Sequence, residues 1–220
     1  MWDSAPVPVL TLAVLTGLAT VLDWGMTARG GKPSVRQWVR PAPVVLMAVT
    51  AVVAGALDEP AGRWLVVALV LGAVGDAFLV DPTPRRFIGG LLAFLLGHLA
   101  YLICFLEVGI EGGWWLVPGT VVVATAFFLG ANVIPGAHRR GGSGLAAAVT
   151  TYMSVIGATA VVGWATGSAW IAAGITVFLA SDTMLGINRF DRELPWAKLP
   201  IIATYHVGQA LMTVGVLLAL

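Results

Sequence analysis

Two aspartates lie in runs of apolar residues, where an ionisable side chain is energetically costly. Asp76 lies in "GDAFLV", at the end of the apolar run "RWLVVALVLGAVGDAFLV", and Asp182 lies in "SDTMLGINRF". Each is followed by a short loop with arginines and then by an apolar run that contains a histidine, His98 in the first case and His206 in the second. Carboxylates and imidazoles can pass protons to and from a bound molecule, so this pattern indicates general acid–base chemistry or proton movement within a membrane.

The apolar runs that hold these residues are long enough to cross a bilayer. Of 220 residues, 59% are hydrophobic and 10% are charged, and the mean hydropathy is +0.93. A soluble domain carries about 25% charged residues. A span needs about 20 apolar residues, and within hydrocarbon only a helix satisfies the backbone of such a run. We therefore predict an all-α polytopic membrane protein in which residues 1–220 form a single integral membrane domain. The eight predicted transmembrane helices cover residues 8–26, 41–57, 64–80, 87–106, 114–134, 145–166, 168–187 and 199–220.

The basic residues predict the orientation of these helices. With eight spans, the odd-numbered loops hold all of the 12 lysines and arginines except Arg63. The positive-inside rule then places the odd-numbered loops in the cytoplasm and both termini outside it, and we expect the plasma membrane of a bacterium. The similar order of aspartate, basic loop and histidine in the two halves predicts a parallel repeat of four helices plus four.

Polar side chains in the cytoplasmic halves of the helices are expected to converge on one pocket, because such groups face a bundle interior or a water-filled cavity. His98 and Tyr101 are one turn apart and share a helix face, as do Tyr205 and Gln209. The candidate catalytic residues are Asp76, Asp182, His98, Tyr101, Tyr205 and His206. The candidate substrate-binding residues are Arg40, Tyr152, Arg86, Asn188, Arg189, Lys198 and Gln209.

Other interpretations of single residues remain open at this stage. An aspartate near a helix end is often an interfacial residue that reaches water, and we expect this of Asp23. A lone membrane histidine is often a packing residue, and the single cysteine, Cys104, is expected to pack in an apolar core.

Several classes of function lack the motifs that they need. The sequence has neither HExxH nor a cluster of cysteine and histidine, so it indicates no metal site. It has no Walker or dinucleotide-binding loop, so no cofactor is expected. The net charge of +1 gives no electrostatic reason to expect a nucleic-acid partner.

The ordered set "GDAFLV…RRFIGGLLAFLLGHLAYLICF" and "SDTMLGINRF…TYHVGQALM" resembles the YhhN family of transmembrane proteins, whose characterised animal members are lysoplasmalogenases. The resemblance runs from Val74 to Met212 and implies eight helices. It implies cleavage of the vinyl ether bond of a lysoplasmalogen to a fatty aldehyde and glycerophosphoethanolamine or glycerophosphocholine. Arg40 and Pro41 stand where the family usually has Lys-Pro. The positions onto which the resemblance carries the family motifs are Gly75, Asp76, Gly97, His98, Tyr101, Ser181, Asp182, Tyr205 and Gln209.

This chemistry needs a proton donor for the β-carbon, a carboxylate beside the resulting oxocarbenium ion and a positioned water molecule. Two carboxylates in different environments can divide these roles. Our hypothesis makes Asp182, which lies deeper in its helix, the general acid, and Asp76 the group that stabilises the cation and accepts a proton from water, and the reverse assignment stays open. Arginines or Lys198 at the cytoplasmic mouth would hold the phosphate of a single-chain lysolipid.

Two other functions fit the same pattern. Paired aspartate and histidine residues also suit a proton-coupled or lipid transporter. A lysophospholipid ester hydrolase could use the same groups.

Overall fold

The computed structural model describes residues 7–80 and 83–220, and these residues contain helices and no strand. The all-α class is therefore confirmed. A π-helical turn, η4 (Ile187–Asp191), continues α8, and two short 3-10 turns are η2 (Ala56–Asp58) and η3 (Gly113–Trp115). The α-helices are α1 (Val7–Arg29), α2 (Pro33–Val39), α3 (Ala42–Val53), α4 (Pro60–Leu79), α5 (Pro84–Val108), α6 (Leu116–Leu129), α7 (Val133–Ala165), α8 (Ala169–Gly186) and α9 (Lys198–Leu217).

Among the described residues, six helices are long and apolar enough to cross a membrane, namely α1, α4, α5, α7, α8 with η4, and α9. This is the composition of an integral membrane protein. The other two predicted spans correspond to shorter helices, α3 with 12 residues and α6 with 14. At about 1.5 Å per residue, neither covers the roughly 30 Å of a hydrocarbon core alone. The number of eight spans thus stays a prediction.

The differences from the predicted boundaries have local causes. The predicted span at 41–57 ends early because the chain turns at Gly55, whose φ of +88° is accessible to glycine at little cost. The basic loop that precedes it contains a helix that the sequence analysis missed, α2, which begins with Pro33. Proline is favoured at the first position of a helix because its missing N–H would have had no partner there.

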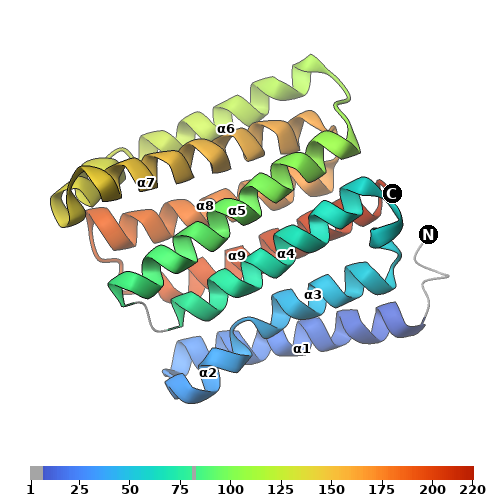
Figure 1. Ribbon diagram of the computed structural model, residues 1–220, viewed down its shortest axis with the longest axis horizontal. Helices are drawn as coiled ribbons and strands as arrows, with labels where there is room; N and C mark the ends of the chain where they lie inside the picture. Colours follow the sequence, from blue (N-terminus) through green and yellow to red (C-terminus); the bar gives the residue numbers. More distant parts are fainter. Residues whose placement is uncertain (1–6, 81–82) are drawn as a thin grey trace. The chain divides into compact units, whose positions relative to one another are not determined.

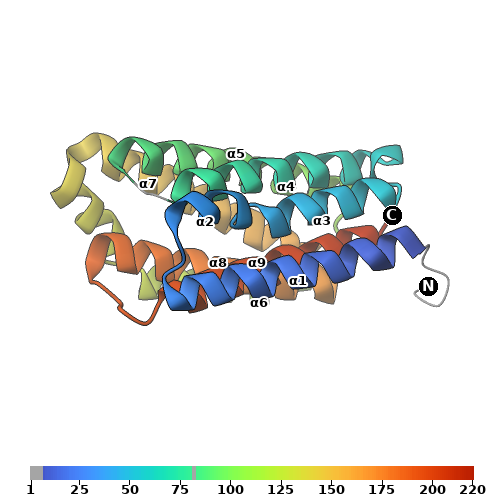
Figure 2. The same cartoon turned by 90° about the horizontal axis from the view of Figure 1, so that it is seen from below.

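The segment α7 consists of two helical sections, of which the second corresponds to the predicted span at 145–166 and the first covers residues that the sequence analysis assigned mostly to a loop. The backbone leaves helical geometry at Gly141 and Gly142, where φ is −148° and +69°. Figure 2 shows the change of direction between the section that begins at Val133 and the one that ends at Ala165. Gly141 and Gly142 therefore separate two helical sections, residues 133–140 and 143–165, and the break falls within the connection that precedes the predicted span at 145–166.

The contacts divide the chain into two compact units. One extends to Val108 and includes Val216–Leu220, and the other is Gly109–Gly215. In the first unit α4 and α5 run side by side in opposite directions, and α1 packs against α3 (Figure 1). Its core includes Leu65, Phe105 and Cys104, so the cysteine is a packing residue as expected.

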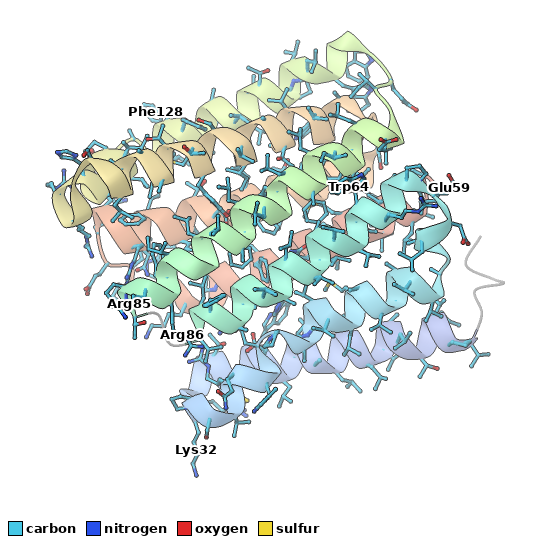
Figure 3. The ribbon with its side chains drawn as sticks, viewed as in Figure 1. Lys32, Glu59, Trp64, Arg85, Arg86 and Phe128 are labelled. Atoms are coloured by element: carbon cyan, nitrogen blue, oxygen red, sulfur yellow. The ribbon has the colours of Figure 1, made fainter. Side chains whose placement is uncertain are left out.

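The charged ends of α4 fit a helix that crosses a membrane. Arg85 and Arg86 lie at the end where α4 connects to α5, whereas Glu59 and Trp64 lie at the opposite end of α4 (Figure 3). Between them the helix is apolar apart from Asp76.

In the second unit, α6 packs on α7 and α7 packs on α8, while α8 and α9 approach closely at glycines. A Cβ atom added at Gly174 would lie 2.7 Å from the backbone nitrogen of Met212, and one at Gly208 would lie 2.9 Å from the carbonyl oxygen of Gly174. Small residues permit such backbone contact between membrane helices. This contact fixes α9 against the helix that carries Asp182.

We expect Gly174→Ala to destabilise the protein by about 1–3 kcal/mol, because the added methyl group meets backbone atoms that no rotamer change can move. Thermal unfolding in detergent measures the effect. Gly144→Ala on α7 is the control, since a Cβ atom there meets nothing within 4 Å. Equal melting temperatures for the two variants would contradict the close α8–α9 contact.

Candidate active site

The first unit holds one polar group of candidate residues on the packed pair α4 and α5. Asp76 is 3% exposed, and His98 and Tyr101 are each 2% exposed. The helices meet tightly beside the aspartate, because a Cβ atom on Gly75 would lie 2.6 Å from the ring of Phe94. His98 therefore lies about one helical turn beyond the level of Asp76, and Tyr101 lies about one turn further. The structure thus brings these three predicted residues to successive levels of one helix pair.

Arg86 has a structural bond in this unit. Its Nη2 donates to the carbonyl oxygen of Ala77 at 2.9 Å, which satisfies a backbone acceptor in the last turn of α4. A cation at a helix C-terminus is also favoured by the helix dipole. Arg86 therefore bonds the first turn of α5 to α4 one residue from Asp76, and its predicted role in phosphate binding stays a prediction.

The second unit joins two predicted residues directly, because the hydroxyl of Tyr152 on α7 donates a hydrogen bond to Oδ2 of Asp182 on α8. The sequence predicted Tyr152 as a substrate-binding residue and gave no signal that it pairs with this carboxylate. The neighbouring Ser181 donates to the carbonyl oxygen of Ile201 on α9 at 2.8 Å. Asp182 is thus held from one side by α7, while the residue before it is fixed to α9.

Helix α9 contributes a buried polar face to the same unit. Tyr205 is 5% exposed, and His206 and Gln209 are each 1% exposed. Nε2 of Gln209 donates to the hydroxyl of Tyr205 at 3.5 Å, which confirms that the two residues share a helix face. The ring of Phe178 on α8 packs edge-on against Tyr205 with centroids 5.3 Å apart.

The π-helical turn η4 carries two of the predicted substrate-binding residues. Asn188 accepts a hydrogen bond from the backbone N–H of Leu194 at 2.7 Å, so its oxygen supports the loop that follows. Arg189 is half-buried, and Lys198 is exposed at the start of α9. π-Helical turns often occur at functional sites, because the extra residue changes the direction of the side chains around it.

Asp23 corrects the sequence analysis, which expected an interfacial residue that reaches water. Its carboxylate is completely buried, and Nε of Arg40 lies 3.1 Å from each of its two oxygens. Nη2 of Arg40 donates to the hydroxyl of Thr27 at 3.0 Å. Asp23 is buried because the basic loop folds into α2 and brings Arg40 back onto α1. The available signal was a lone aspartate near the end of an apolar run that a basic segment follows.

The candidate residues are distributed over the described helices of both units. Asp76, His98, Tyr101, Arg86 and Arg40 belong to the first, and the remaining candidates belong to the second. The single pocket expected from the sequence stays a prediction.

Comparison with known proteins assigns both units to one family. The YhhN family model matches residues 35–216. A lysoplasmalogenase from Mycobacterium bovis is 33% identical over 184 residues, which cover 80% of this chain and 70% of that protein. Lysoplasmalogenase TMEM86B from Sus scrofa is 33% identical over 167 residues, 68% of this chain and 61% of that protein. Lysoplasmalogenase TMEM86A from Homo sapiens is 29% identical over 175 residues, 72% of this chain and 67% of that protein. No solved structure matches the chain.

We expect Asp23→Asn to destabilise the protein by about 3–5 kcal/mol, because it leaves the largely buried Arg40 without its counter-charge. Thermal unfolding in detergent measures this loss. Asp58→Asn removes an exposed carboxylate from η2 and should change the stability by less than about 0.5 kcal/mol. A normal melting temperature for Asp23→Asn would show that the ion pair contributes nothing net.

Proposed function

The chain belongs to the YhhN family, and we propose that it is a lysoplasmalogenase, a membrane hydrolase that cleaves the vinyl ether bond of a single-chain lysolipid. The observation that carries this proposal is the 33% identity to the lysoplasmalogenase of Mycobacterium bovis over 80% of the chain. The family match includes both carboxylates and both histidines of the candidate groups. The reaction consumes one water molecule and yields a fatty aldehyde and glycerophosphoethanolamine or glycerophosphocholine.

The chemistry begins with transfer of a proton to the β-carbon of the vinyl ether, which leaves an oxocarbenium ion. Water adds to this cation and loses a proton, and the hemiacetal then collapses to the aldehyde and the glycerol hydroxyl. The enzyme must therefore supply an acid, a negative charge beside the cation and a group that accepts the proton from water. We assign these tasks to Asp76 and Asp182, while His98, Tyr101, Tyr205 and His206 orient water and the leaving oxygen.

The hydrogen bond from Tyr152 supports a division of roles between the two carboxylates. Because Oδ2 of Asp182 accepts a hydrogen bond from the hydroxyl of Tyr152, the carboxylate is held in one orientation, and we assign to it the stabilisation of the cation. Asp76 on α4 then acts as the general acid. This is the reverse of the first assignment made from the sequence.

For the membrane arrangement we propose eight spans in a single membrane domain, with the shorter α3 and α6 completed by their flanking turns. The odd-numbered loops are cytoplasmic and both termini lie outside, in the plasma membrane of a bacterium. A repeat of four helices plus four is part of this proposal, and one boundary between the two units, at Val108 and Gly109, lies between the fourth and fifth predicted spans, although Val216–Leu220 of the eighth belongs to the first unit. The substrate phosphate would lie at the cytoplasmic side, near Arg40, Arg86, Arg189 and Lys198, with Asn188 and Gln209 contributing polar contacts.

We expect purified protein in detergent to release fatty aldehyde from lysoplasmenylethanolamine, and Asp76→Asn and Asp182→Asn to lower kcat by about 10²–10⁴-fold, the usual contribution of an acid or base. Aldehyde and free fatty acid are measured together, with the ester analogue as second substrate. Asp58→Asn controls for the loss of a carboxylate.

Release of fatty acid instead of aldehyde would replace the proposal with a lysophospholipid ester hydrolase. Absence of turnover by folded protein would replace it with transport, which liposome flux measures. Full activity of either aspartate variant would contradict the assigned chemistry.

We expect Tyr152→Phe to lower kcat by about 10–100-fold with little change in KM, because it removes one hydrogen bond that orients the Asp182 carboxylate. Steady-state kinetics across pH provide the measurement. Thr150→Val is the matched control on the same helix. The hydroxyl that it removes donates to the carbonyl oxygen of Ala146, one turn earlier in α7. Equal kcat values for both variants would show that Asp182 does not depend on Tyr152.

A further inference from the structure

Two arginines share one face of α2 beside a single carboxylate from α1. Arg36 and Arg40 are four residues apart, and the N–H of Arg40 bonds to the carbonyl oxygen of Arg36 at 2.9 Å, so the helical turn continues through both. Side chains four apart on a helix lie next to one another. The carboxylate is that of Asp23, which is completely buried.

The carboxylate is committed to Arg40, as is the hydroxyl of Thr27. Nε of Arg36 is buried and has no hydrogen-bond acceptor in the described part of the chain. The pKa of Arg36 is lowered chiefly by burial and then by the charge of Arg40, and Asp23 only partly opposes this. Two guanidinium groups and one carboxylate leave one positive charge in excess.

The position of these two arginines and the geometry of the guanidinium group favour a phosphate as the ligand. A guanidinium presents parallel N–H groups that match two phosphate oxygens, and desolvation strengthens such a pair. The α2 helix is not among the candidate spans and directly follows α1, so the proposed membrane arrangement places it near the lipid phosphates. Arg36 is half-buried, which leaves part of its side chain within reach of a ligand.

We propose that Arg36 and Arg40 bind the headgroup phosphate of the lysolipid substrate, and that Asp23 and Thr27 hold Arg40 in position for it. This subsite rests on the proposed function and specifies its substrate class: phosphorylated lysolipids bind here, and alkenylglycerols without a phosphate do not use it. Arg36 touches the ligand, whereas Asp23 is a positioning residue.

The test compares two vinyl ether substrates, a lysoplasmenylethanolamine and the 1-alkenylglycerol with the same chain. We expect Arg36→Gln to raise KM about tenfold for the phosphorylated lipid while kcat changes little, and to leave both constants unchanged for the alkenylglycerol. Arg36→Lys should restore part of the loss because it restores the charge. Arg85→Gln is the control, since it removes an exposed arginine from another loop of the same unit. An equal effect of Arg36→Gln on both substrates, or an equal effect of Arg85→Gln, would overturn the proposal.

A binding measurement separates this inference from the proposed function. The probes are a saturated 1-alkyl lysophosphatidylethanolamine, which cannot be hydrolysed as a vinyl ether, and 1-alkylglycerol, with tryptophan fluorescence as the signal. Binding of the phosphorylated probe that Arg36→Gln weakens about tenfold supports the subsite even if the wild type releases no aldehyde. Aldehyde release together with unchanged probe binding by Arg36→Gln would overturn the subsite and leave the function standing.

Competition experiments distinguish a lipid headgroup from free inorganic phosphate as the ligand of this site. Glycerophosphoethanolamine should displace the phosphorylated probe, with a loss of competition in Arg36→Gln. Binding of inorganic phosphate that depends on Arg36, without such binding of the lysolipid, would assign the site to the free ion and overturn the headgroup proposal.

Discussion

A polar side chain in a helix that crosses hydrocarbon has no water to bind, so its partner must come from the chain itself. Most of the threonines here bond a carbonyl one turn back on their own helix, as Thr16, Thr50 and Thr159 do. Such bonds satisfy the hydroxyl without joining helices. Polar bonds that run between helices instead orient one helix face towards another, and several of them involve the functional candidates or their neighbours.

In the second unit these bonds connect α7, α8 and α9. Tyr152 reaches Asp182, Ser181 reaches the first turn of α9, and the indole N–H of Trp164 reaches Thr176 at 3.0 Å. The glycines between α8 and α9 add contact that depends on shape alone. A carboxylate held in this way keeps a fixed orientation before substrate arrives, which is what stabilisation of a developing cation requires.

The sequence predicted the helical class, the burial of Asp76, His98 and His206 and the shared face of Tyr205 and Gln209, because apolar runs and helical spacing report these directly. It did not predict the pair formed by Tyr152 and Asp182. Spacing along one helix gives the direction of a side chain but not the helix that lies opposite. It also missed α2, since a short helix in a basic loop carries no apolar periodicity. Without α2, the burial of Asp23 had no visible cause.

Helix α1 is joined to the end of α2 through the contact between Asp23 and Arg40. The prediction that missed α2 therefore also missed this contact. Only Val9 and Asp23 are buried among the residues of α1, so its apolar surface is mostly available to lipid. The family match begins at residue 35 and thus includes Arg36 and Arg40 but not Asp23. If α1 served only as an anchor, a buried carboxylate would be an unnecessary cost. Its burial is reasonable when the same carboxylate orients Arg40 and neutralises one of two adjacent guanidinium groups, which leaves the other for an anionic ligand.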